Sequence, residues 1–295
     1  MEIPDFFIKK LKEQYNENEV EKIKEGLQKR RNVTFRINTL KTNKEEIQII
    51  LKQEKIEYDE VSWNKDAIVL KNVTEQDIKK LEIYNEGKIY LQSLSSMLPV
   101  IILQPNEKEN ILDMTAAPGG KTTQIAAYTK NKAFITATEK NKIRLQRLEY
   151  NVKKQGVKNI NIMQEDSRKL SDYFSFDRIL LDAPCSGSGT ENVFSEKFTE
   201  ELINRSIKTQ EELLVKALNI LKSGGEMVYS TCSILKDENE NVLKNVLKKF
   251  NAEIVPIEKI ENIPCLPVII DGTLCVCPSD LYEGFFVAKI RKNRK

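Results

Sequence analysis

From residue 110 onward, short apolar runs alternate with longer amphipathic segments, and this alternation limits the possible folds more than any other feature of the sequence. The apolar runs are short enough to be buried strands and lie at residues 111–112, 133–137, 160–163, 178–181 and 226–229. The amphipathic segments have helical spacing and lie near 120–129, 140–154, 206–222 and 237–249. Repeated strand–helix units predict an α/β fold with a doubly wound parallel sheet.

Residues 1–105 lack this rhythm and are typical of a small α+β module. The expected elements are a helical region at 5–30, strands at 33–38, 56–61 and 67–70, and helices that begin near Asn43, Thr74 and Ser93. The polar loop at 104–109, which contains a proline, is the predicted boundary. The sequence therefore predicts two domains, 1–105 and 106–295.

Histidine is absent from the 295 residues. Its absence excludes Ser-His-Asp triads, Cys-His pairs and histidine-ligated metal sites. Acid–base chemistry then falls to aspartate, glutamate, lysine, tyrosine or cysteine. The five cysteines are odd in number and indicate free thiols, and the trio of Cys265, Cys275 and Cys277 lacks the fourth ligand of a zinc site. We therefore expect no metal.

No apolar run approaches the ~18 residues of a membrane-spanning helix. The first residues include acids and no cleavage site of small residues, unlike a secretory signal. We therefore expect a cytoplasmic protein without a membrane segment, and we expect it to be a monomer.

Polar or glycine-containing segments follow every predicted strand of the large domain. In an open parallel sheet, ligands bind beyond the carboxyl ends of the strands. Gly119 and Gly120 let the backbone approach a ligand closely before a helix begins. Glu139 is placed to accept hydrogen bonds from ribose hydroxyls, and Asp166 to accept one from an exocyclic amine. The other candidates at these strand ends are Asp113, Asp182, Cys185 and Cys232.

Each of these residues has a simpler interpretation when it is taken alone. A single carboxylate is more often a helix cap or a solvated group, and a single cysteine is more often a small buried side chain. Four acids at four strand ends are harder to explain in that way. Residues 115–122 also approach the P-loop pattern, but Thr115 replaces its first glycine and Pro118 removes a backbone amide. A P-loop nucleotidase stays open as an alternative.

Three motifs stand at these strand ends: LDMTAAPGGKT at 112–122, DAPCSG at 182–187 and STCS at 230–233. Together they resemble the Sun/Nop family of RNA cytosine-C5 methyltransferases. Further segments that resemble the family are RINTLK at 36–41, QSLSSMLP at 92–99 and EGFFVA at 283–288. The resemblance therefore covers nearly the whole chain. It implies a Rossmann-like methyltransferase domain preceded by an RNA-binding module.

The same resemblance implies S-adenosylmethionine as the cofactor. Glu139 would bind its ribose and Asp166 its adenine, while Asp182 would lie near its methyl group and the target base. The loop that would hold its methionine part comprises Thr115, Ala116, Ala117, Pro118, Gly119, Gly120 and Lys121.

The resemblance also implies that Cys232 is the nucleophile and that Cys185 assists product release. A thiolate that adds to C6 of cytosine makes C5 nucleophilic. Because a free thiol has a pKa of roughly 8.5, it needs a positive neighbour, and Lys121 and the cofactor sulfonium are the candidates. Asp182 could hydrogen-bond N3 of the base. Pro184-Cys185 and Glu191 to Val193 also match elements of DNA cytosine-5 methyltransferases, but they lie too close together, which indicates coincidence.

Basic runs lie at 29–36, at 140–158 and in the final KIRKNRK, although the net charge is only +3. They favour a polyanionic partner. We expect that partner to be RNA, with ribosomal RNA first and transfer RNA second. A non-catalytic RNA-binding or ribosome-assembly factor with the same fold is the remaining alternative.

Overall fold

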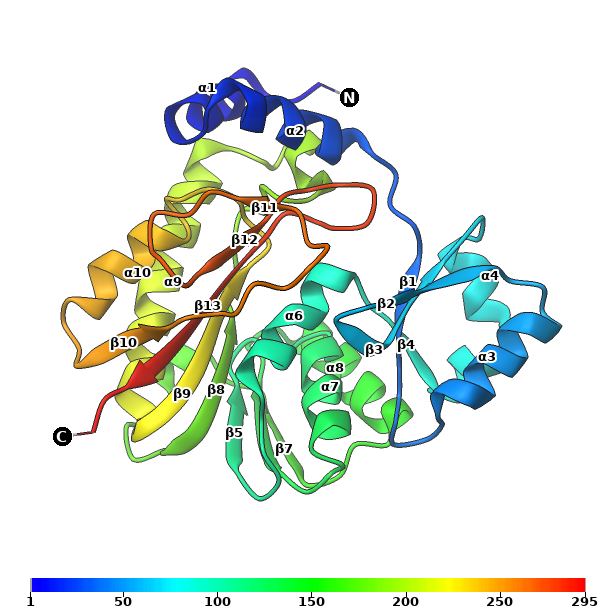
Figure 1. Ribbon diagram of the computed structural model, residues 1–295. Coiled ribbons are helices and arrows are strands. Elements are labelled where there is room, and N and C mark those ends of the chain that lie inside the picture. Colours follow the sequence, from blue (N-terminus) through cyan, green and yellow to red (C-terminus); the bar gives the residue numbers. More distant parts are fainter. Residues whose placement is uncertain (1, 295) are drawn as a thin grey trace.

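The computed structural model describes residues 2–294 and confirms the predicted α/β class (Figure 1). The order of strands in the large sheet is β11-β12-β13-β9-β8-β5-β6-β7, and β10 pairs with β13. Its five parallel strands are β5 (Asn110–Asp113), β6 (Phe134–Thr138), β7 (Ile160–Met163), β8 (Phe176–Asp182) and β9 (Leu221–Thr231). Because the chain runs from β5 out to β7 and returns to β8, the switch point lies between β5 and β8.

Helices cover both faces of this sheet, as a doubly wound fold requires. They are α6 (Leu94–Leu103), α7 (Gly120–Tyr128), α8 (Lys142–Gln155), α9 (Glu200–Ile220) and α10 (Glu240–Leu247), with the short helices η1 (Ser167–Lys169) and η2 (Glu191–Phe194). Neighbouring strand residues face opposite sides: Leu181 packs in the cluster of α9 and α10, and Leu180 in that of α6 and α7. The predicted helix at 206–222 begins earlier, since the Thr199 hydroxyl caps the Leu202 amide.

The carboxyl-terminal strands add an antiparallel part to the sheet that the sequence reading did not predict. They are β10 (Ala252–Val255), β11 (Cys265–Leu266), β12 (Leu274–Val276) and β13 (Phe285–Lys292). β13 pairs antiparallel with β9 and joins the other three strands to the parallel part. The large sheet is therefore mixed.

The N-terminal module is a four-stranded antiparallel sheet with the order β2-β3-β1-β4. Its strands are β1 (Thr34–Ile37), β2 (Tyr58–Val61), β3 (Asn64–Leu70) and β4 (Ile89–Leu91), and its helices are α3 (Lys44–Gln53), α4 (Glu75–Lys80) and α5 (Glu82–Asn85). Phe35, Ile68 and Leu51 are fully buried between the sheet and these helices. The opposite face, through Ala67 and Val69, packs with residues of α6.

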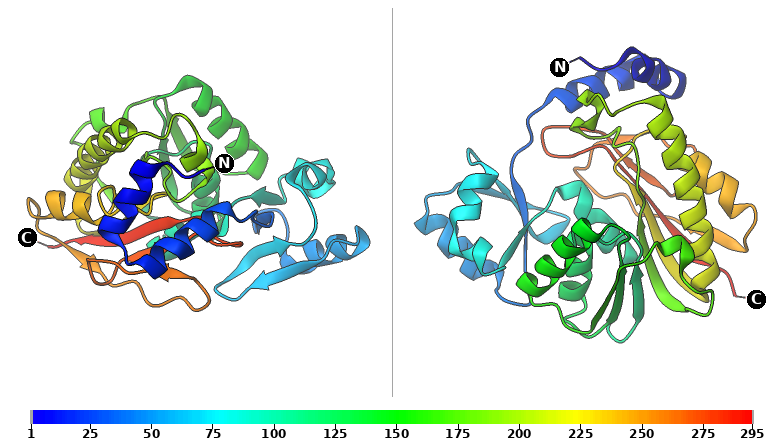
Figure 2. Two further views of the ribbon diagram at one scale, coloured as in Figure 1. Left: turned by 90° about the horizontal axis from the view of Figure 1, so that it is seen from above. Right: turned by 180° about the vertical axis from the view of Figure 1, so that it is seen from behind.

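Helices α1 (Asp5–Gln14), α2 (Glu17–Gln28) and α6 precede the predicted boundary at 104–109 but pack on the large domain. Helices α1 and α2 lie over the large domain, away from α3 and α4 (Figure 2). Phe7 and Ile23 share an apolar cluster with Leu181. Gly26 sits so close to the loop after β12 that a Cβ there would lie 1.9 Å from the Pro278 carbonyl oxygen. Helix α6 likewise packs on the large sheet.

Among residues 2–294, no helix has both the length and the apolar character needed to cross a membrane.

Candidate active site

Cys185 and Cys232 meet at the carboxyl ends of two adjacent parallel strands. Cys232 follows the last residue of β9, and Cys185 lies in the loop that follows β8. The register pairs Asp182 with Ser230, so both loops leave the sheet at the same level. The Gly189 amide donates to the Cys232 carbonyl at 3.0 Å, and the two sulfur atoms are 3.0 Å apart. The fold thus brings into contact two thiols that are widely separated in sequence.

The environment of the Cys185 thiol favours its protonated form. The hydrogen bond with Cys232 raises the pKa of Cys185 well above its usual value, and burial and the negative charge of Glu238 act in the same direction. At neutral pH, Cys185 therefore keeps its proton and can donate it toward the Cys232 sulfur.

Asp182 is held by an ion pair with Lys121. The Lys121 ammonium, at the start of α7, lies 2.7 Å from Asp182 Oδ2 and 2.8 Å from Ser96 Oγ. Ser230 Oγ donates to Asp182 Oδ1 at 2.7 Å. The sequence suggested Lys121 as the positive neighbour of a thiol, but these hydrogen bonds of its ammonium go to Asp182 and Ser96.

The loop between β5 and α7 is built for a close turn. Gly119 has a φ of 107°, which is strained for any side chain, and a Cβ there would lie 3.0 Å from Leu148. Thr115 Oγ1 donates to the Asp182 carbonyl at 2.6 Å, which ties this loop to the end of β8. Asp113 is buried and accepts from Thr122 at 2.7 Å, and burial raises its pKa to about 6.

Glu139 and Asp166 line one narrow cavity of about 40 Å³, together with Thr115 and Pro184. Glu139 Oε1 accepts from the Asn141 amide at 2.8 Å. Asp166 accepts two hydrogen bonds from the Arg168 guanidinium, at 3.0 and 2.6 Å, and these hold its pKa at about 2. The structure thus places both sequence-predicted carboxylates beside the loop that begins at Thr115.

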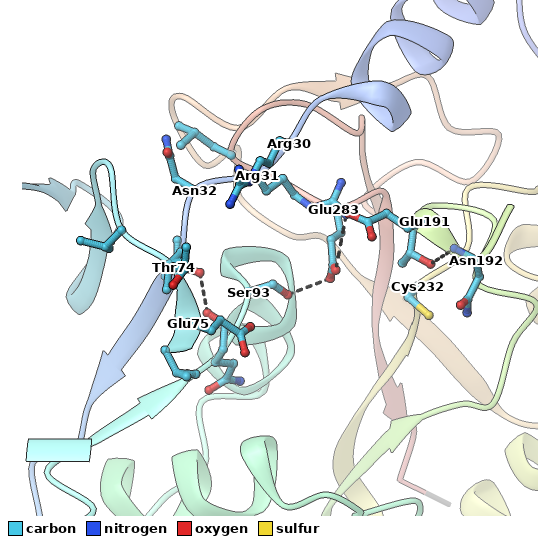
Figure 3. Close-up of a pocket in the computed structure, with 17 residues that line it drawn as sticks. Arg30, Arg31, Asn32, Thr74, Glu75, Ser93, Glu191, Asn192, Cys232 and Glu283 are labelled. Atoms are coloured by element: carbon cyan, nitrogen blue, oxygen red, sulfur yellow. Dashed lines mark hydrogen bonds and ion pairs between the residues drawn. The ribbon is translucent and has the colours of Figure 1, made fainter. Parts of the chain in front are cut away.

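Cys232 also lines two larger cavities. One, of about 740 Å³, lies between the segment after α2, the N-terminal sheet and the loop of Glu191 (Figure 3). The other, of about 360 Å³, is lined by the Thr115–Lys121 loop and Asp182. Cys232, Ser93 and Glu283 line both cavities, and Ser93 Oγ donates to Glu283 Oε2 at 2.8 Å. Cys232 is therefore positioned where two compartments adjoin.

Several residues that line these cavities were not predicted from the sequence. Tyr90, Gln92 and Ser93 come from the end of the N-terminal module, Glu283 lies just before β13, and Phe285 is the first residue of β13. Segments 92–99 and 283–288 resembled the family, but nothing in their residue types indicated a cavity. Glu191, part of the near-match to DNA enzymes, lies 3.3 Å from Arg31 at the larger cavity and belongs to η2.

Within residues 2–294, no three histidine, cysteine, aspartate or glutamate side chains are grouped so that they could hold a metal ion.

The fold and this site define a Rossmann-like methyltransferase with an added N-terminal module. The chain matches the family model described as 16S rRNA methyltransferase RsmB/F over residues 100–291, and an RsmF/B-like ferredoxin-like domain over residues 3–76. The chain belongs to this family, which confirms the resemblance of its motifs to the Sun/Nop enzymes.

The chain is similar to relatives described as methyltransferases of ribosomal RNA and to others described as methyltransferases of transfer RNA. A 28S rRNA (cytosine-C(5))-methyltransferase from Mus musculus is 38% identical over 98% of this chain and 38% of its own length. A tRNA (cytosine(49)-C(5))-methyltransferase from Pyrococcus abyssi is 35% identical over 97% of this chain and 96% of its own length. The crystal structure of NSun6 from Pyrococcus horikoshii with SFG aligns at a TM-score of 0.89 and 25% identity, covering 99% of each chain.

The chain spans 38%, 55% and 58% of the length of three curated relatives that it matches, from Mus musculus, Pyrococcus horikoshii and Aliivibrio salmonicida.

Proposed function

We propose that this protein transfers a methyl group from S-adenosylmethionine to C5 of a cytosine in RNA. The observation that carries the proposal is the contact of the two cysteine sulfurs, 3.0 Å apart, where two cavities adjoin. Family membership and the cytosine-C5 methyltransferases among its relatives support the same reaction.

The narrow cavity and the loop beside it fit S-adenosylmethionine by the chemistry of their side chains. Asp166, ionised beside Arg168, suits the exocyclic amine of adenine, and Glu139 suits the ribose hydroxyls. The Thr115–Lys121 loop offers a small, tightly turned backbone for the methionine part. A relative's structure with SFG, an analogue of this cofactor, supports the assignment. When bound, S-adenosylmethionine supplies an electrophilic methyl group.

Cys232 is the proposed nucleophile. It lines both large cavities, whereas Cys185 is not among the residues that line either. Its thiolate adds to C6 of the base, which makes C5 nucleophilic, and a proton shared between N3 and the Asp182 carboxylate neutralises the negative charge that develops at N3. After C5 is methylated, water in the cavity accepts the C5 proton, the electron pair of that C–H bond re-forms the C5–C6 double bond, and the C6–S bond breaks with its electron pair leaving on sulfur. Cys185 then donates to the departing Cys232 sulfur, in keeping with its raised pKa.

Lys121 takes a different part from the one that the sequence suggested. Its ammonium fixes and neutralises the Asp182 carboxylate through the 2.7 Å ion pair. We therefore assign it to orienting Asp182 toward the base.

The target base would enter through the 740 Å³ cavity, beside Arg30 and Arg31. A paired base must first leave its stack. Ribosomal RNA is the first substrate that we propose, because the family model and two of the curated relatives cited above are described as rRNA methyltransferases. Transfer RNA is a second candidate, because the Pyrococcus abyssi enzyme is matched over 96% of its length.

We also propose a cytoplasmic monomer that needs no metal. The five free thiols support a reducing compartment, and the lack of histidine supports a cysteine mechanism without a histidine-ligated metal.

Single-turnover incubation of the protein with total RNA and methyl-tritiated S-adenosylmethionine tests the activity. Label in 5-methylcytosine supports the proposal, and its absence with an intact fold contradicts it. Bisulfite sequencing of RNA from a strain that lacks the gene then identifies the RNA and the position.

A further inference from the structure

Glu238 is a fully buried carboxylate beneath the two cysteine loops, and no step of the proposed reaction uses it. Its side chain is 0% exposed, and burial raises its pKa. A buried carboxylate is costly unless several donors compensate it, so its partners indicate its role.

Those partners come from both cysteine loops. Glu238 Oε1 accepts from the Ser186 amide at 2.8 Å and from Gln210 Nε2 at 3.2 Å. Glu238 Oε2 accepts from the hydroxyls of Ser186 and Ser233, at 2.5 and 2.7 Å. Ser186 follows Cys185 directly, and Ser233 follows Cys232 directly. The Glu238 carboxylate therefore accepts hydrogen bonds from the residue that follows Cys185 and from the residue that follows Cys232.

The backbone of Glu238 is itself fixed. Its carbonyl accepts from the buried Tyr229 hydroxyl at 2.6 Å, and Tyr229 belongs to β9. Gln210, from α9, also donates to the Pro184 carbonyl at 2.9 Å. Hydrogen bonds thus hold Glu238 to strand β9 and to helix α9. Because its carboxylate also bonds to Ser186 and Ser233, it restrains the positions of both cysteine loops.

We propose that Glu238 is a positioning residue that holds the loops of Cys185 and Cys232 in register, so that their sulfurs stay in contact. Its effect on catalysis rests on the proposed function, but its effect on the distance between the sulfurs does not. Without the hydrogen bonds of Glu238 to Ser186 and Ser233, the two loops can move independently. Small misplacements of reacting groups slow reactions strongly.

Two substitutions at Glu238 distinguish the effect of its hydrogen bonds to the two cysteine loops from the effect of its negative charge. Glu238→Gln keeps an oxygen for the Ser186 amide, and the two serine hydroxyls can rotate to accept from the new amide group. Glu238→Ala removes every acceptor. Glu240→Ala is the matched control, since Glu240 is also a buried glutamate but accepts from the Ile269 amide at 3.3 Å, outside both cysteine loops.

Oxidation by diamide measures the sulfur geometry directly. The two thiols lose two protons and two electrons to the azo bond of diamide, which becomes a hydrazine, and an S–S bond forms between Cys185 and Cys232. The crosslink joins tryptic peptides 179–197 and 223–236 and is quantified by mass spectrometry. We expect it to form at least ~10-fold more slowly in Glu238→Ala, because the effective concentration of one thiol near the other falls. Glu238→Gln and Glu240→Ala should stay near the wild-type rate.

Methyl transfer is measured on the same proteins. Glu238→Ala should lose about 100-fold in kcat with little change in KM for S-adenosylmethionine, and Glu238→Gln should recover most of it. If wild type crosslinks readily but transfers no methyl group, the proposed function fails and the positioning role stands. If folded Glu238→Ala crosslinks and turns over like wild type, the positioning role is wrong.

A second variant serves if Glu238→Ala does not fold. The pair Ser186→Ala and Ser233→Ala removes the two hydroxyl links and leaves the carboxylate and the Ser186 amide in place. We expect slower crosslinking in this double variant too, and an unchanged rate would overturn the proposal.

Discussion

Asp182 joins three parts of the site. Its carboxylate accepts from Lys121 and Ser230, and its carbonyl accepts from Thr115. The sequence placed Asp182, Cys185 and Cys232 at strand ends, where parallel strands bring ligand-binding residues together. It could not show that the Lys121 ammonium lies 2.7 Å from Asp182, since that contact depends on how α7 packs beside β8.

Replacing Lys121 with methionine tests its assignment to Asp182. The variant keeps the packing of the stem but leaves Asp182 without its cation. We expect kcat for methyl transfer to fall about 100-fold, since Asp182 is no longer oriented, and KM for RNA to change little. Lys132→Met, which removes a more exposed ion pair with Glu107, is the control. Normal turnover of Lys121→Met would remove this lysine from the machinery.

Asp166→Ala tests the proposed adenine contact. Loss of a hydrogen bond to a charged group should weaken binding of S-adenosylmethionine by roughly 10- to 100-fold. Glu212→Ala is the matched control, because it removes the other partner of Arg168 and leaves the Arg168–Asp166 pair intact. Calorimetric titration gives both affinities. Equal affinity of wild type and Asp166→Ala would place adenine elsewhere.

At the scale of elements, the parallel strands and their helices were predictable because their apolar runs are periodic and bounded. Strands β11 and β12 were not, because they have two and three residues, too few for any period to be read. The four residues of β10 and the eight of β13 were not assigned to strands either. Helices α1 and α2 were predicted as helical, but an amphipathic face does not say which surface will cover it. Phe7 and Ile23 pack with the large sheet, and this depends on the tertiary fold.

Glu226 joins the predicted and unpredicted parts of the sheet. It lies on β9 and pairs with Arg178 of β8 at 2.6 Å, and with Lys289 and Arg291 of β13 at 3.0 and 2.6 Å. Burial acts to raise its pKa, but hydrogen bonds from Arg291, Lys289 and Arg178 outweigh burial and lower the pKa to about 2. Its stabilising contribution is therefore present above the ordinary glutamate pKa of 4.5 and is lost as pH falls toward 2.

Glu226→Gln should therefore be less stable than wild type at pH 7, and this difference should shrink as pH falls from 4.5 toward 2. Urea unfolding at several pH values measures the free energy of unfolding of each protein. Glu253→Gln, which removes an exposed partner of Arg291 at 3.8 Å, should show no such dependence. A difference between wild type and Glu226→Gln that does not change with pH would contradict the ion-pair account.

At the scale of the whole molecule, the larger cavity lies where the N-terminal module meets the catalytic domain. Arg30 and Arg31 line it from the segment that connects α2 to β1. Their basic character was visible in the sequence, but their place in the same cavity as Cys232 depends on the packing of α1 and α2 on the large domain.

Reversing the charge of Arg30 and Arg31 to glutamate should weaken RNA binding and flatten its dependence on salt, because fewer phosphate counterions are released. The control replaces Lys52 and Lys55 with glutamate, because these two lysines are exposed and do not line the cavity. Filter binding over a range of salt concentrations gives the slopes. If the slope of the arginine variant equals that of wild type, these arginines do not contact phosphate.

The central claim is the division of labour between the two sulfurs that lie 3.0 Å apart. Denaturing gel electrophoresis of Cys232→Ser and Cys185→Ala after incubation with RNA and S-adenosylmethionine tests it most directly. Cys232→Ser should form no covalent adduct, because a hydroxyl is too weakly acidic to add to C6. Cys185→Ala should still attack and transfer methyl, and then accumulate a protein–RNA adduct that survives denaturation. A stable adduct with Cys232→Ser and none with Cys185→Ala would contradict the account.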